Sequence, residues 1–310
     1  MSPGDEFLRY ENMRHGMDHD RYDWSILEDR DPIRWPDGKA LAVWINVCVE
    51  HFPLNPDSPG FKAPGNMTMP YPDLRHYTLR DYGNRIGIFR ILEALRSAGL
   101  TASFAVNGEI AERYPWLVEH LAGTDGELIA HGWNMDCAHS SAVDAATERE
   151  WIARTRTALA PFLSVNGPPG WLGPARSQSA RTPELLAEAG FCWFADWVND
   201  ELPYPFRTVQ ATLFNLPLSQ ELEDRFIIDS NLHSETEYAD QIIDAFDFLL
   251  AEAREQLAGR LLAINLHPWI IGQPHRIGQL ERVLAHIGDH AEVVWNAAPS
   301  TIIKHADVKE

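Results

Sequence analysis

The chain alternates short, almost wholly apolar segments with longer segments in which apolar residues recur at helical spacing. The first apolar segment, Lys39–Cys48 (KALAVWINVC), predicts a strand that is buried on both faces. Helical spacing from Ile88 to Leu95 then predicts a helix that ends at Gly99, and a second strand is predicted at Thr101–Val106. This order of helix, glycine and strand sets the pattern for the rest of the chain.

The same junction recurs four more times. We expect a glycine to supply the left-handed residue that ends each helix, at Gly126, Gly190, Gly259 and Gly288. The apolar runs after these glycines are predicted strands: Glu127–Ala130, Phe191–Ala195, Leu261–Leu266 and Ala291–Trp295. Helices that alternate with short buried strands predict a parallel α/β architecture, either a barrel or a doubly wound sheet.

The pattern favours one domain with irregular ends. Residues 1–38 are polar and rich in Asp, Arg and Pro, so we predict an N-terminal arm, then a single domain over 39–305 and a short tail over 306–310. Residues 52–75 are rich in proline and predict a long loop, which we expect to fold over the rim of the sheet as a lid or a partner contact. A chain of 310 residues could form two domains, but single α/β barrels reach this length.

Composition excludes several classes of protein. Hydrophobic residues make up 45% of the chain, which excludes disorder for its bulk. The 26 Lys and Arg against 45 Asp and Glu leave a net charge of −19, so we expect neither nucleic acid nor an anionic membrane as a partner. No Gly-rich phosphate-binding loop follows a predicted strand, which weighs against a nucleotide cofactor.

The cysteines and the N-terminus bear on the compartment. Cys48, Cys137 and Cys192 are odd in number and far apart, which fits a reducing compartment better than a disulfide framework or a zinc ribbon. The segment Met1–Asp20 is charged and lacks the apolar core of a signal peptide, and no apolar run approaches the roughly 20 residues of a membrane helix. We therefore expect a cytoplasmic protein.

Polar and aromatic side chains follow most of the predicted strands. The carboxyl ends of parallel strands form one rim, where parallel α/β folds bind their ligands. In the order of the strands that they follow, these residues are Glu50 and His51, Asn107, His131, Trp133 and Asp136, Trp171 and Arg176, Trp197, and His267 and Trp269. Their recurrence predicts a functional site at this rim.

Each of these residues also has a purely structural interpretation. A glutamate after a strand often caps a helix, a histidine in an apolar stretch such as His131 is often a hydrogen-bonded core residue, and Arg176 could be a surface cation. The tryptophans could be core packing, but four of them at strand ends favour the walls of a pocket for a small, flat or saccharide-like ligand. Pro268 would hold His267 rigidly at the rim.

The residue types fit hydrolysis of an amide. Such a reaction needs a base that deprotonates water, an acid that protonates the leaving nitrogen and a group that holds the oxyanion. Glu50 is the candidate base and His267 the candidate acid, whereas His51, His131, Arg176 or a backbone amide at the rim could hold the oxyanion. We assign substrate binding to Asn107, Arg176, Trp133, Trp171, Trp197 and Trp269.

Several segments resemble the polysaccharide deacetylase superfamily, also called carbohydrate esterase family 4. They are Tyr82–Gly87, Ser103–Gly108, Glu127–Gly132, Gly170–Trp171 and, as the most specific one, Leu266–Arg276. The resemblance is strongest for the branch that contains metal-independent allantoinases and cyclic imide hydrolases, together with a peptidoglycan deacetylase-like group. It implies a distorted, incomplete (β/α) barrel.

The resemblance also bears on metal binding. Deacetylases of the family use an Asp pair after the first strand, one as base and one as metal ligand, and a His-x3-His motif for two more ligands. Glu50 falls at the base position, His51 at the ligand position and His131 at the first motif histidine, but Met135 replaces the second histidine. Thioether sulfur is a poor ligand for zinc, so no metal is favoured. If zinc were bound, we would expect His51, His131 and Asp136 to hold it.

Three functions are open at this point. The residues and the resemblance favour a hydrolase that opens a C–N bond of a cyclic imide or cyclic amide, of the succinimide, glutarimide, hydantoin or allantoin type. The alternatives are a metal-dependent N-deacetylase of a saccharide and a non-catalytic binder of a small ligand. The expected partner is a small molecule in each case, and the helix faces leave room for a homo-oligomer. Mutation of Glu50 separates an enzyme from a binder, because only the enzyme has turnover to lose.

Overall fold

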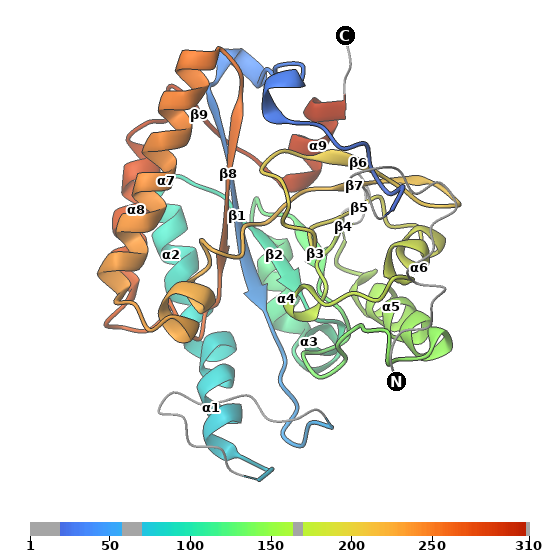
Figure 1. The fold of residues 1–310 in the computed structure, drawn as a ribbon. Coiled ribbons are helices and arrows are strands. Elements are labelled where there is room, and N and C mark those ends of the chain that lie inside the picture. The colour runs from blue at the N-terminus through green and yellow to red at the C-terminus, as the bar shows by residue number, and fades with distance from the viewer. Residues whose placement is uncertain (1–18, 58–69, 164–169, 308–310) are drawn as a thin grey trace.

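A curled sheet of nine strands forms the centre of the molecule (Figure 1). The computed structural model describes residues 19–57, 70–163 and 170–307. Its strands are β1 (Leu41–Val49), β2 (Ser103–Val106), β3 (Leu128–Ala130), β4 (Gly170–Trp171), β5 (Trp193–Phe194), β6 (Tyr204–Arg207), β7 (Thr212–Asn215), β8 (Arg260–Leu266) and β9 (Val294–Asn296). The curled, open sheet confirms the predicted distorted, incomplete (β/α) barrel.

The strand order is β6-β7-β5-β4-β3-β2-β1-β8, and β9 pairs with the first part of β1. Every pair is parallel except β6 with β7, which form an antiparallel hairpin that the sequence pattern did not predict. In the register of the central strands, Asn46 of β1 lies opposite both Ser103 of β2 and Asn265 of β8. The carboxyl ends of β1, β2 and β8 therefore reach the same rim.

Helices wrap the outside of this sheet (Figure 1). They are α1 (Leu74–Tyr82), α2 (Ile88–Ala98), α3 (Gly108–Arg113), α4 (Pro115–Ala122), α5 (Ala145–Leu159), α6 (Thr182–Glu188), α7 (Glu235–Gln256), α8 (Ile277–Gly288) and α9 (Pro299–Asp307). Two π-helical turns, at Gly83–Gly87 and Arg225–Ser230, and short 3-10 turns at Leu27–Asp29, Pro36–Gly38 and Pro174–Arg176 complete the regular structure. Among the described residues, no helix is long and apolar enough to cross a membrane.

The two faces of β1 explain its continuous apolar sequence, because all nine of its residues are buried. Alternate residues from Leu41 to Val49 pack against the helices, whereas Ala42, Trp44 and Cys48 face the inside of the curl. Side chains of a strand alternate between faces. Glu50, directly after the strand, therefore shares the inner face with Cys48.

The predicted glycine caps are confirmed in part. Gly99 and Gly190 have φ values of 66° and 80° and supply left-handed residues after α2 and α6. The prediction is wrong for Gly126, Gly259 and Gly288, none of which has a positive φ. Helix α7 is instead capped by Leu257, at φ 54°.

Close packing explains two of those three glycines. A Cβ at Gly259 would lie 2.5 Å from Nε1 of Trp35, and one at Gly126 would lie 2.3 Å from the carbonyl oxygen of Ala102. Glycine is present there because a side chain would not fit. A Cβ at Gly288 would meet the carbonyl oxygen of Ala98 at 3.1 Å, which is less severe.

The ends of the chain contact the barrel in part. Trp35 is buried, and its Nε1 donates a hydrogen bond to the carbonyl oxygen of Arg260 at 2.8 Å, so the described end of the predicted arm packs on the first residue of β8. The boundaries of the arm, domain and tail stay predictions, and residues 1–18 and 308–310 lie outside the described residues. So do residues 58–69, the middle of the loop predicted as a lid.

Candidate active site

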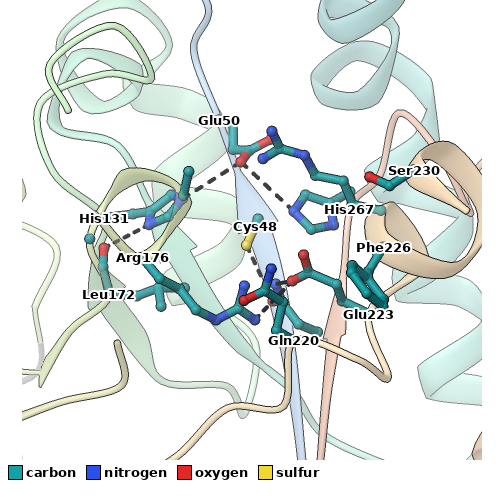
Figure 2. Close-up of a pocket in the computed structure, with 14 residues that line it drawn as sticks. Cys48, Glu50, His131, Leu172, Arg176, Gln220, Glu223, Phe226, Ser230 and His267 are labelled. Atoms are coloured by element: carbon teal, nitrogen blue, oxygen red, sulfur yellow. Dashed lines mark hydrogen bonds and ion pairs between the residues drawn. The ribbon is translucent and has the colours of Figure 1, made fainter. Parts of the chain in front are cut away.

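A pocket opens at the carboxyl ends of β1, β3, β4 and β8 (Figure 2). Its volume is about 170 Å³. The residues that line it are Cys48, Glu50, His131, Leu172, Gly173, Ala175, Arg176, Gln220, Glu223, Arg225, Phe226, Ser230, Asn265 and His267. Four residues of the predicted site, Glu50, His131, Arg176 and His267, are thus brought to one pocket.

The carboxylate of Glu50 lies between two imidazole rings. Its Oε1 atom is 3.7 Å from Nε2 of His131 and 3.8 Å from Nε2 of His267. Its Oε2 atom accepts a hydrogen bond from Nε1 of Trp269 at 3.3 Å. The backbone holds the residue as well, because Nδ2 of Asn84 donates to the carbonyl oxygen of Glu50 at 2.8 Å.

Each imidazole is oriented through its other ring nitrogen. Nδ1 of His131 lies 2.7 Å from the carbonyl oxygen of Leu172. Nδ1 of His267 lies 2.6 Å from Oδ1 of Asp224, whose Oδ2 accepts the backbone N–H of His267 at 2.9 Å. Both Nε2 atoms therefore point at Glu50. Nε2 of His131 is buried and has no hydrogen-bond partner in the described structure.

The pocket favours a carboxylate flanked by positive charge. Burial alone would raise the pKa of Glu50, but the neighbouring His267, His131 and Arg225 outweigh it and lower that pKa to about 2. Burial opposes the charged form of His131, yet the adjacent Cys48 and Glu50 raise its pKa to about 10. The pKa of His267 is likewise raised against the effect of burial, chiefly by Asp224. These shifts favour the anionic form of Glu50 and the protonated forms of the two imidazoles.

Arg176 forms one wall of the pocket. Its guanidinium pairs with the carboxylate of Glu223 at 2.8 Å, and Glu223 also accepts a hydrogen bond from Nδ2 of Asn265 at 3.0 Å. Arg176 and the preceding Ala175 have φ values of 55° and 51°, a left-handed conformation that is uncommon outside glycine. This turn, between Gly173 and Ser177, directs the Arg176 side chain toward the pocket (Figure 2).

His51 and Asn107 lie at the same rim but do not line the pocket. Nε2 of His51 faces Oε1 of Glu109 at 3.5 Å. The amide of Asn107 is used by the backbone: it accepts the N–H of His51 at 2.7 Å and donates to the carbonyl of His131. Asn107 therefore ties the loops after β1 and β3 together, and it does not line this pocket.

The four tryptophans do not form the pocket walls either. Trp171 is fully buried against Phe191 and His139, and Trp133 stacks under the guanidinium of Arg154 at 3.5 Å. Trp197 donates its Nε1 to Gln178 at 2.8 Å and packs on Phe206. Trp269 alone reaches the site, through its hydrogen bond to Glu50. Bulky rings after a strand are drawn into the core by their apolar area, which explains the difference.

The ligand set that the family resemblance implied is not assembled. His51 faces Glu109, and Oδ2 of Asp136 accepts the backbone N–H of Asp57 at 2.7 Å, so neither joins His131. Within the described residues, the group of acidic, histidine or cysteine side chains that is close enough to share an ion is a different one, namely Cys48, Glu50 and His131. The side chains present thus do not fit the expected set of His51, His131 and Asp136.

Sequence reasoning missed several residues of the pocket. Cys48 could have been found, because it lies in β1 two residues before Glu50, which directly follows that strand on the same face. Asp224, Glu223 and Gln220 precede a π-helical turn and carry no local motif. Only the fold brings them beside His267 and Arg176.

Comparisons with known proteins agree with this fold. The family model for polysaccharide deacetylases matches residues 77–193. The chain is 24% identical over 295 residues to a polysaccharide deacetylase-type protein of Schizosaccharomyces pombe, which covers 86% of this chain and 90% of that protein. It is 22% identical over 246 residues to the peptidoglycan deacetylase of Helicobacter pylori, which covers 69% of this chain and 82% of that protein.

A solved structure shows the same architecture over nearly the whole chain. The crystal structure of PuuE allantoinase superposes with a TM-score of 0.78 at 23% identity, over 89% of this chain and 94% of that chain. At this identity the likeness establishes the fold. The match to the family model and this shared fold together support the resemblance noted in the sequence.

Proposed function

Since a family model for polysaccharide deacetylases matches residues 77–193 and the fold resembles that of an allantoinase, we propose that the chain is a hydrolase of carbon–nitrogen bonds whose substrate is a cyclic imide or cyclic amide. The succinimide, glutarimide, hydantoin and allantoin types are the candidates. One observation carries the proposal: the Glu50 carboxylate lies between the Nε2 atoms of His131 and His267 inside a small pocket.

The size of the pocket supports a single ring as substrate. In another protein, a cavity of about 150 Å³ accommodates one benzene molecule. A pocket of about 170 Å³ therefore suits one five- or six-membered ring with small substituents. Polar groups on its walls, among them Arg176 and Gln220, could hydrogen-bond the carbonyl and amide groups of such a ring.

Each reacting group has a role in the proposed hydrolysis. Glu50 accepts a proton from water as the water oxygen attacks a ring carbonyl, and His131 stabilises the oxyanion that forms. The C–N bond then breaks, and His267, oriented by Asp224, donates a proton to the departing nitrogen. For a cyclic imide, the products are a carboxylate and an amide in one open chain, and for a simple cyclic amide they are a carboxylate and an amine. His51 has no role in this scheme because it faces Glu109.

We propose that this reaction needs no resident metal. The carbonyl of a cyclic imide is activated and its nitrogen is a good leaving group, so less electrophilic assistance is needed than for an N-acetyl sugar. The donor set expected from the family, His51, His131 and Asp136, is not brought together. The positive charge around Glu50 comes instead from His131, His267 and Arg225.

A substrate panel tests the proposal. Chelator-treated protein would be assayed on succinimide, glutarimide, hydantoin, allantoin and an oligomer of N-acetylglucosamine. We expect ring opening of at least one cyclic compound and no release of acetate from the sugar. Acetate release that depends on added zinc would favour a saccharide N-deacetylase, and binding of a ring without turnover would favour a non-catalytic binder.

A further inference from the structure

Cys48 faces the pocket but takes no part in the proposed hydrolysis. Its Sγ atom, a carboxylate oxygen of Glu50 and a ring nitrogen of His131 all lie within 4.8 Å of one another. The exposed fractions of these residues are only 2%, 5% and 2%. Figure 2 shows Cys48 beneath Glu50, between the rings of His131 and His267. Three buried donors of different chemistry thus converge on one point.

We propose that Cys48, Glu50 and His131 form a binding site for a thiophilic divalent cation of the zinc class, with His267 as the fourth donor. The site differs from the one that the family resemblance implied, since it contains neither His51 nor Asp136. It rests on the proposed function in one respect only: a cation here would take Glu50 and His131 away from the reaction.

The spacing of the donors supports this assignment. Distances of 3.7 Å and 3.8 Å from Oε1 of Glu50 to the two Nε2 atoms are too long for hydrogen bonds. Zinc bonds of about 2.0–2.2 Å to nitrogen and oxygen imply donor separations of about 3.4 Å in a tetrahedron. A contraction of a few tenths of an ångström would therefore bring Oε1 of Glu50 and each of the two Nε2 atoms to the separation of zinc ligands.

The orientation of the rings supports it as well. Histidines that bind a metal usually donate their other ring N–H to a carboxylate or a backbone carbonyl. Nδ1 of His131 faces the carbonyl of Leu172 at 2.7 Å, and Nδ1 of His267 faces the carboxylate of Asp224 at 2.6 Å. Both Nε2 atoms are thus held toward the same point before any ion binds.

An unsatisfied atom points to the same place. Nε2 of His131 is buried and has no hydrogen-bond partner in the described structure, which is costly for a polar atom. A bound cation would displace the proton from this nitrogen and take its place as the partner. Thiolate and imidazole donors select zinc-like ions, whereas magnesium and calcium prefer oxygen ligands, so the donor set defines the class of ion.

Cobalt titration tests the site directly. Co²⁺ would be added to chelator-treated protein, with absorbance recorded in the near ultraviolet for thiolate-to-cobalt charge transfer and in the visible for tetrahedral coordination. We expect one ion per chain and a charge-transfer band that C48S abolishes. Loss of a group that only orients a ligand costs about 10–100-fold in affinity, so loss of the thiolate should cost at least that much.

Cys192 provides the matched control. It is an exposed free cysteine that does not line the pocket. C192S should keep the full band and affinity. A band that persists in C48S, or that disappears in C192S, would overturn the assignment and identify binding to a surface thiol.

Inhibition kinetics with zinc can fail independently of the proposed function, so the two proposals are tested separately. Zinc should inhibit ring opening over the concentration range in which it binds, and C48S should need at least about tenfold more zinc for the same fractional inhibition of its own metal-free rate. Zinc that binds through Cys48 but leaves the rate unchanged, or raises it, would overturn the inhibitory role. If metal-free protein opens no ring at all, the proposed function fails, while the cobalt titration still decides the site.

Discussion

The Oε1 atom of Glu50 lies 3.8 Å from Nε2 of His267, although the two residues follow different strands, β1 and β8. The parallel pairing of these strands brings their carboxyl ends to one level, and Asp224 then fixes the imidazole. A base and an acid are thus placed next to each other in a small pocket. The predictions below test how this arrangement is held and what it does.

The carboxylate of Asp224 should be needed to position His267. Both of its oxygens accept hydrogen bonds from His267, at Nδ1 and at the backbone N–H. In the D224N variant one of these oxygens is replaced by an NH₂ group. That group cannot accept a hydrogen bond from His267, so the imidazole ring loses part of its orientation. We expect kcat to fall by about 10²-fold or more with little change in KM. D244N, at an exposed position of α7, is the control and should behave like the wild type.

Loss of either member of the Arg176–Glu223 ion pair should destabilise the fold, because the remaining charge is left unpaired. Removal of one member of a buried ion pair costs about 3–5 kcal/mol, because the other charge is left buried. We expect R176M to lower the free energy of unfolding by an amount approaching that range, measured by urea denaturation. The double variant R176M/E223Q should recover most of the loss. Additive losses in the double variant would show that the pair is not coupled.

The loop that carries His267 should depend on Gly87. A Cβ at Gly87 would lie 2.0 Å from the carbonyl oxygen of Pro268, so G87A must displace the loop. We expect a lower melting temperature and a lower kcat. A Cβ at Gly278, in α8, meets no atom within 4 Å, so G278A should be neutral or more stable by up to about 1 kcal/mol. Equal effects of the two variants would contradict this explanation.

Glu148 should make the fold sensitive to acid. Burial alone would raise its pKa, but hydrogen bonds from His139, Thr182 and Ser179 outweigh burial and lower it. A carboxyl with a lowered pKa stabilises the fold above its ordinary pKa of 4.5, and that contribution is lost as the pH falls through the lowered value.

The E148Q variant tests this linkage. It should be less stable than the wild type at neutral pH, by about 1.5–3 kcal/mol for hydrogen bonds to a charged group, and should lose less stability below pH 4.5. Urea denaturation at a series of pH values measures both effects. E150Q, at an exposed position of the same helix, should leave the pH dependence unchanged.

The sequence predicts the buried central strand of the sheet better than the partly exposed strands at its edge. Strand β1 was predicted as Lys39–Cys48 and is Leu41–Val49, because burial on both faces leaves a continuous apolar run. The hairpin of β6 and β7 was missed, since its strands are short, partly exposed and contain Pro205. Its pairing depends on tertiary contacts that leave no periodic signal.

The site is predictable only where a residue follows a strand. Glu50, His131 and His267 were found because each stands at the carboxyl end of a predicted strand. Asp224 has no such mark and is identified only by its contact with His267. Trp171 occupies a comparable position but is buried in the core. The position of a residue after a strand predicts that it lies at the rim of the sheet. Whether its side chain points into the pocket or into the core depends on packing, which the sequence does not show.

The most direct test of the account is steady-state kcat/KM of E50Q on the cyclic imide that the chelator-treated wild type opens best. Gln keeps the size of the side chain but cannot accept the proton of water. We expect kcat/KM to fall by about 10²–10⁴-fold, with circular dichroism unchanged and the ring still bound. E112Q, at a position outside the pocket, should retain the wild-type rate. Near-normal turnover in E50Q would contradict the assignment of Glu50 as the base.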